Sequence, residues 1–259
     1  MGKLITTGRF IYATGIIALG ILCLVSRDFI VGRPPMWPLG FNINPALAYI
    51  SGVVLIIAAI AIILNKKGRI AALVISALIF FFSVLRHLTN FMNDWANAYK
   101  AIALVGGSFI IAASFPSQDL TKNSGLRSDD RLRSALITTG SIFLAVFFIA
   151  CGYAHFKFVD FIESFIPSYI PFHVFWAYFC GICLFAGGLG LLIPQTRRAA
   201  AILSGCMVLG WFLLLHIPRF IANTNDVSDR MGLCESFTFV GIFLVLAGMV
   251  PGFKNKRSL

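Results

Sequence analysis

The chain has 259 residues, of which 59% are hydrophobic and only 12% are charged, and its mean hydropathy is +0.89. This composition supplies too few polar side chains to cover a water-soluble globule, so it excludes a soluble domain and indicates an integral membrane protein. The net charge of +11 would suit a nucleic-acid-binding protein, but its distribution follows membrane topology instead. We expect the lipid bilayer, and no nucleic acid, as a partner.

Eight apolar segments follow one another along the chain. A helix needs about 20 residues to cross a hydrocarbon core. Four segments clearly reach that length and four are shorter or carry a charge near one end; the eight lie at 4–25, 45–64, 70–87, 101–115, 135–154, 172–193, 199–218 and 236–250. We therefore predict an all-α membrane protein with eight transmembrane helices.

The basic residues are distributed unequally between the two sides of this predicted topology. If both termini share one side, the excess of positive charge lies there, on Lys3, Arg9, Lys66, Lys67, Arg69, Lys122, Arg127, Arg131, Arg133, Arg197, Arg198, Lys254, Lys256 and Arg257. Cytoplasmic loops are enriched in lysine and arginine. We expect both termini in the cytoplasm and the protein in a bacterial inner (cytoplasmic) membrane.

An internal repeat organises the chain. The sequence LITTG occurs at residues 4–8 and again at 136–140, and the same offset of 132 aligns Gly20 with Gly152. After a loop of different length, an offset of 129 aligns His87 with His216, and it also matches Gly52 with Gly181 and Arg69 with Arg198. An internal repeat defines the structural unit of a protein, so we identify it before we assign a fold.

The unit contains four helices, so its two copies enter and leave the membrane on the same side. We predict a first four-helix repeat at 1–115, a polar cytoplasmic linker at 116–134, a second four-helix repeat at 135–251 and a basic cytoplasmic tail at 252–259. The two tandem bundles then have parallel orientation and are related by an axis along the membrane normal.

The second repeat carries a recognisable order of motifs. Gly152 is followed by His155 and Lys157, glycines recur from 181 to 190, and Arg-Arg-Ala-Ala-Ala opens the next helix at 197–201. This order resembles the DoxX-like family of four-helix membrane proteins, here as a tandem duplication. The first repeat departs from it, since Cys23 stands where His155 does. Some members are associated with quinone-linked oxidation, so the resemblance implies a quinone as a candidate cofactor and other membrane redox proteins as candidate partners.

Ionisable residues gather at the helix ends away from the termini. All four histidines of the chain lie there, and such residues are costly to bury in a membrane. As candidates for binding a ligand we take His155, His216, Arg219 and Glu235 from the second repeat and Arg86, His87 and Lys100 from the first. Histidine can exchange protons near neutral pH, and arginine can hold an anionic or quinone-like oxygen. Alternatively, these side chains only cap helices, pair with one another and anchor the membrane interface.

Cysteine and metal chemistry receive weaker support. Cys180 and Cys183 form a CxxC motif, which can cycle between dithiol and disulfide, but they lie inside an apolar helix where cysteine more often serves as a packing residue. The histidines lack the HxH or HxxxH spacing that places two ligands on one helix face. We therefore expect no metal site.

These observations favour a DoxX-like membrane protein that binds a small lipophilic or anionic molecule at its non-cytoplasmic face, as a component of a quinone-linked oxidoreductase system. A small-solute transporter with its path between the repeats is an alternative, although no charged residue falls near a predicted mid-membrane position. A non-catalytic membrane scaffold or assembly factor is a second alternative. The residues do not decide whether the protein is an enzyme.

Overall fold

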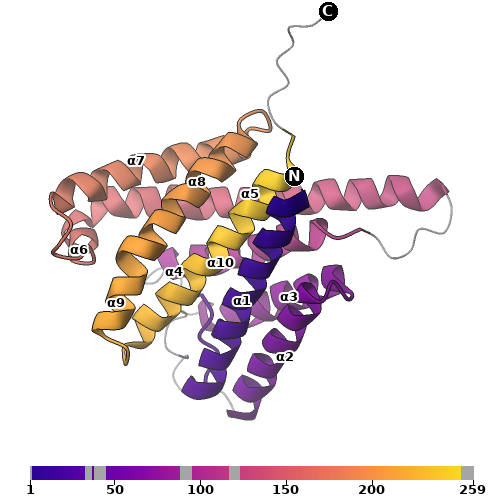
Figure 1. Cartoon of the computed structure of the whole chain (residues 1–259), viewed down its shortest axis with the longest axis horizontal. Coiled ribbons are helices and arrows are strands. Elements are labelled where there is room, and N and C mark those ends of the chain that lie inside the picture. Colours follow the sequence, from indigo (N-terminus) through magenta and orange to yellow (C-terminus); the bar gives the residue numbers. More distant parts are fainter. Residues whose placement is uncertain (1, 33–36, 38–44, 88–94, 117–122, 252–259) are drawn as a thin grey trace, which may run out of the picture.

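A computed structural model (Figure 1) describes residues 2–32, 37, 45–87, 95–116 and 123–251. All regular structure in these ranges is helical. The predicted tail at 252–259 and most of the loop after the first helix lie outside the described residues.

Each predicted span coincides with a helix or a continuous helical segment, and none extends more than two residues past its end. In chain order the elements are α1 (Gly2–Ser26), α2 (Pro45–Ile63), α3 (Gly68–His87), α4 (Trp95–Ala113), α5 (Asn123–Lys157), α6 (Val159–Glu163), α7 (His173–Leu192), α8 (Arg197–Trp211), the π-helical turn η1 (Phe212–His216), α9 (Ile217–Ala222) and α10 (Val227–Met249). In the described part, seven helical segments are long and apolar enough to cross a membrane, with α8, η1 and α9 counted as one. The prediction of an all-α membrane protein is confirmed.

The remaining apolar helix, α4, is shorter, with its apolar part at Asn97–Ala113. It nevertheless runs from one end of the bundle to the other. Near its start, Ala101 contacts Gly32 beyond the end of α1, and just past its end Phe115 packs against Gly68 at the start of α3. We call the end of the bundle that carries the four histidines the histidine end, and the opposite end, where Ile5 packs against Gly248, the terminal end.

The second part of the predicted polar linker is helical. Residues 123–134 are helical and continue directly into the apolar part of α5, which is 35 residues long and extends beyond the bundle in Figure 1. Polarity indicates that a segment lies outside hydrocarbon, but it does not prevent a helix from continuing into water. The connection between the halves is thus a helix over at least its second part.

The helices pack in a pattern that matches between the two halves. Within each half, α1 packs on α2 and α3 on α4, as α5 packs on α7 and α8 on α10. The most extensive contacts, however, join the halves: α1 packs along α10, and α4 packs along α5. The first helix of each half therefore has the last helix of the other half as its main neighbour.

Glycines of the repeat make these helix crossings close. A methyl group on Gly241 would lie 2.7 Å from the carbonyl oxygen of Gly8, and one on Gly106 would lie 2.9 Å from that of Gly140. Gly8 and Gly140 are the last residues of the two LITTG segments, and Gly106 and Gly241 are also equivalent at an offset of 135. Small residues let helix backbones approach closely where lipid supplies no hydrophobic driving force. The repeated segment thus marks two equivalent contacts between the halves.

The third helix of the second half changes its winding near the histidine end. Pro218 has no backbone N–H to donate to the preceding turn, and the π-helical turn η1 lies just before it. The carbonyl of Leu214 in this turn accepts a hydrogen bond from the Tyr169 hydroxyl instead. Local π turns and neighbouring hydroxyls are the usual ways in which a membrane helix tolerates proline.

Candidate functional site

A cavity of about 330 Å³ lies near the histidine end, lined mainly by residues of α5, α7, α8 and α10. Its wall is mainly apolar, with the aromatic side chains of Phe147, Phe148, Trp176, Trp211 and Phe239. Two histidines, a lysine and a glutamate join them, and all four are among the predicted site residues: Lys100, His155, His216 and Glu235. An apolar cavity with a few convergent polar groups is the usual form of a small-molecule site.

His155 reaches the cavity from α5. Its Nδ1 lies 2.8 Å from the carbonyl oxygen of Cys151, one turn earlier in the helix. A carbonyl can only accept, so in the neutral ring Nδ1 carries the proton and Nε2 is the acceptor. This bond fixes the tautomer of His155 and leaves Nε2 able to accept a hydrogen bond.

His216 reaches the same cavity from the π-helical turn η1. In a regular α-helix with 3.6 residues per turn, positions five apart point roughly 140° away from each other. A π turn closes over five residues, and here both Trp211 and His216 line the cavity. On the facing helix, Gly232 makes room for the ring, since a methyl group there would lie 3.0 Å from His216 Nδ1.

Lys100 and Glu235 form an ion pair at the edge of the cavity, with 2.6 Å between Nζ and Oε2. The Glu235 side chain is only 3% exposed, and its other oxygen accepts the Gly32 N–H at 2.8 Å. Gly32 has a φ of +85°, which glycine adopts without strain. Since Lys100 comes from α4, the first half contributes a charged residue to the cavity of the second.

Arg219 does not line the cavity, contrary to the prediction that it would share the pocket with His216. Its Nε donates to Asp229 Oδ1 at 2.8 Å, and its guanidinium lies 4.6 Å above the centre of the Phe165 ring. Phe165 does line the cavity. Arg219 therefore connects the loop after α6 to the start of α10 and supports the cavity wall from behind.

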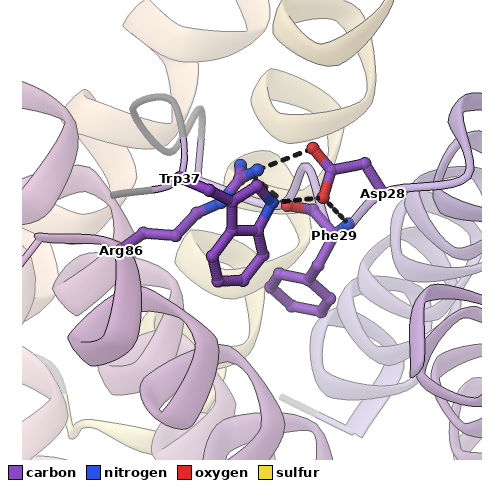
Figure 2. A network of polar contacts seen from close by, with 4 residues as sticks. All are labelled: Asp28, Phe29, Trp37 and Arg86. Atoms are coloured by element: carbon purple, nitrogen blue, oxygen red, sulfur yellow. Dashed lines mark hydrogen bonds and ion pairs between the residues drawn. The ribbon is translucent and has the colours of Figure 1, made fainter. Parts of the chain in front are cut away.

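Arg86 belongs to a polar network in the first half (Figure 2). Its Nη2 lies 2.6 Å from Asp28 Oδ2, its Nη1 donates to the Phe29 carbonyl at 3.2 Å, and its guanidinium stacks 4.1 Å from the centre of the Trp37 ring. Trp37 Nε1 donates to Asp28 as well, at 3.0 Å. The Arg86 side chain is 4% exposed, so these neighbours occupy the space around its guanidinium.

The same region of the first half is filled by aromatic packing. Phe82, which is equivalent to Trp211 by the repeat, stacks on Phe29 with 4.3 Å between ring centres. Both rings are buried. We call Asp28, Phe29, Trp37, Phe82 and Arg86 the aromatic plug. The second half has an open cavity where the first half has this plug.

The other predicted residues are placed apart from this cavity or at its border. His87 bonds through Nδ1 to the Ser83 carbonyl at 2.8 Å and lines a separate hollow of about 260 Å³ between α3 and α4.

Cys180 lines the cavity but Cys183 does not. All six cysteines lie in the described residues, and none of them is in a disulfide.

The described residues contain no group of three histidine, cysteine, aspartate or glutamate side chains placed to hold a metal ion. The fourth histidine, His173, is also not in the cavity wall, and its Nε2 lies 3.2 Å from the Pro167 carbonyl oxygen. The two histidines, the lysine and the glutamate that line the cavity come from four helical segments: α4, α5, η1 and α10.

The aromatic wall was not predicted from the sequence. Phenylalanine is frequent throughout the chain, with 26 residues, so its position in any one helix gives little signal. Comparison of the repeats gives a clearer signal, because Trp176 and Trp211 align with Leu47 and Phe82 of the first repeat. A change of side-chain size between equivalent positions can mark where two copies have come to differ.

A protein-family model described as a domain of unknown function (DUF8561) matches residues 144–224 of the chain. No curated protein and no solved structure matches. The matched range begins within α5 and ends just after α9, so it includes His155, His216 and most of the cavity wall. It does not include Lys100 or Glu235.

Proposed function

We propose that the chain consists of two four-helix units of parallel orientation, with both termini on the cytoplasmic side of the membrane. The matched helix contacts and the equivalent glycine crossings support this arrangement. Eight crossings, including α4, return the chain to its starting side. The concentration of basic residues at the terminal end supports its cytoplasmic placement.

Within this arrangement, the cavity of the second unit binds a small lipophilic molecule that has a polar, hydrogen-bonding head. The observation that carries this proposal is the meeting of His155, His216, Lys100 and Glu235 in one apolar cavity of about 330 Å³. Aromatic rings provide flat apolar contact, and the two histidines can exchange hydrogen bonds and protons with carbonyl or hydroxyl oxygens.

A quinone is one molecule of this class, since its ring is flat and apolar and its oxygens accept hydrogen bonds. The DoxX-like pattern of residues 152–201 agrees with that choice. In this proposal the protein serves a quinone-linked oxidoreductase system by holding the quinone at the non-cytoplasmic side.

The test compares three histidine variants purified in mild detergent. His155→Leu and His216→Leu remove polar groups of the cavity, whereas His173→Leu changes a histidine outside its wall. Small molecules that copurify are extracted and quantified per protein by mass spectrometry. We expect a lipophilic molecule to be retained by the wild type and by His173→Leu and lost from the other two. Equal retention in all three variants would show that the cavity does not bind it.

A further inference from the structure

A second and larger hollow lies between α7 and α8, with a volume of about 840 Å³ and an almost wholly apolar wall. It extends from Ile170 and Leu214 near the histidine end to Ile193 and Thr196 near the terminal end. Both helices belong to candidate membrane spans, and they contact each other; in Figure 1 they lie close together near the turn that joins them and diverge away from it. We call this hollow the α7–α8 groove. Its lining residues extend over most of the length of both helices.

Small residues form the floor of the groove. A methyl group on Gly187 would lie 2.6 Å from Ser204 Oγ, and one on Gly190 would lie 2.8 Å from the Ala200 Cβ. The two helices therefore touch along a line of small side chains. Leu203 stands at the side of the groove and is 70% exposed. The groove is thus open toward the lipid along the outer face of α7 and α8.

The groove and the cavity share part of their walls. Four residues line both: Trp176, Cys180, Met207 and Trp211. The two indole rings meet edge to face, with 6.2 Å between their centres and 88° between their planes. The boundary between the two spaces is therefore made of side chains, and these two tryptophans are its largest members.

On the basis of the proposed function, we infer that the ligand is an amphiphile with a hydrocarbon tail, which reaches the cavity sideways from the bilayer. The polar head passes the Trp176 and Trp211 rings and meets His155 and His216. The tail remains in the α7–α8 groove, where an apolar chain keeps apolar neighbours along its whole length. The wall that the groove shares with the cavity favours this occupant over an unrelated bilayer lipid.

Gly210 offers a way to block the groove without disturbing a buried contact. It lines the groove, and a methyl group added there would meet no atom within 4 Å. The Gly210→Phe variant places a ring in the groove beside Trp211. Leu209→Phe is the matched control, because Leu209 is its neighbour on the same helix, is 40% exposed and lines neither hollow.

Two probes distinguish binding of the polar head from binding of the hydrocarbon tail. One is a benzoquinone with a long alkyl chain, and the other is the same benzoquinone with a methyl group in place of that chain. Binding to the protein in lipid nanodiscs is followed by quenching of tryptophan fluorescence. For the long-chain probe, we expect Gly210→Phe to weaken binding at least about tenfold, while Leu209→Phe stays within about twofold of the wild type. The methyl probe should bind all three proteins equally.

Unchanged binding of the long-chain probe by Gly210→Phe would overturn the groove as the place of the tail and would indicate that the groove holds only bilayer lipid. Failure of the proposed function gives a different result. In that case the methyl probe quenches the tryptophan fluorescence of His216→Leu as strongly as that of the wild type, or neither probe quenches the wild-type fluorescence in a saturable way.

Discussion

Lys100 and Glu235 occupy equivalent positions of the two repeats, and they form a 2.6 Å ion pair with each other. The pair lies where α4 meets α10, the last helices of the two halves. Glu235 is almost fully buried, at 3% exposure. Removal of one partner from a buried pair leaves a charge that neither water nor protein neutralises.

We therefore expect Lys100→Ala to lower the free energy of unfolding by about 3–5 kcal/mol. The measurement is denaturant or thermal unfolding in a fixed detergent. The reversed pair, Lys100→Glu with Glu235→Lys, should recover part of this loss, because opposite charges again face each other. If the reversed pair were as unstable as Lys100→Ala, the attraction between the two charges would not be the source of the effect.

The glycine crossings predict a contrast between two Gly→Ala substitutions. At Gly106 the new methyl group would lie 2.9 Å from the Gly140 carbonyl oxygen, so α4 and α5 must separate. Overpacking of this kind costs about 1–3 kcal/mol. At Gly210 the methyl group has open space, and alanine favours the helix over glycine by up to about 1 kcal/mol. Unfolding measurements should show opposite signs for the two variants.

Arg219 and Asp229 should act as one unit in supporting the cavity wall. Each single alanine variant should free the Phe165 loop, which hydrogen exchange of residues 163–172 would report as faster exchange. The double variant should exchange about as fast as either single one, because both changes break the same contact. Fully additive effects would mean that the two side chains stabilise the loop independently.

The aromatic plug predicts unequal effects at two equivalent positions. Phe82 is buried at 5% exposure and stacked on Phe29, so Phe82→Ala should cost about 3–5 kcal/mol. Trp211 borders two hollows, so fewer atoms pack against it. We expect Trp211→Ala to destabilise the protein less, although it removes the larger side chain. Equal losses of unfolding free energy in Phe82→Ala and Trp211→Ala would contradict the difference between the aromatic plug and the cavity.

The sequence predicted the helices well because hydrophobic length is a direct consequence of the bilayer. It also predicted the equivalence of Lys100 and Glu235, but not their contact. An alignment of repeats shows which positions correspond, whereas contacts depend on which helices become neighbours. Here α1 and α5 each pack mainly on the other half, and no pattern within one helix reveals that choice.

The cavity was predicted only in part, for a related reason. His155, His216, Glu235 and Lys100 were recognised because ionisable residues are rare in a membrane. Arg219 was placed in the same pocket, but a nearby carboxylate, Asp229, pairs with it instead. The aromatic wall depends on how four helices pack, and the winding of η1 lies next to Pro218; hydropathy measures neither.

A strict two-fold dimer of one four-helix chain could not contain the Lys100–Glu235 pair. A residue beside a two-fold axis faces its own copy, so a lysine there would meet a lysine, and a glutamate would meet a glutamate. Joining both copies in one polypeptide removes that restriction, because each copy can change without the other. Opposite charges at the central contact, and a cavity in one half where the other half has the aromatic plug, are asymmetries that two identical copies could not contain.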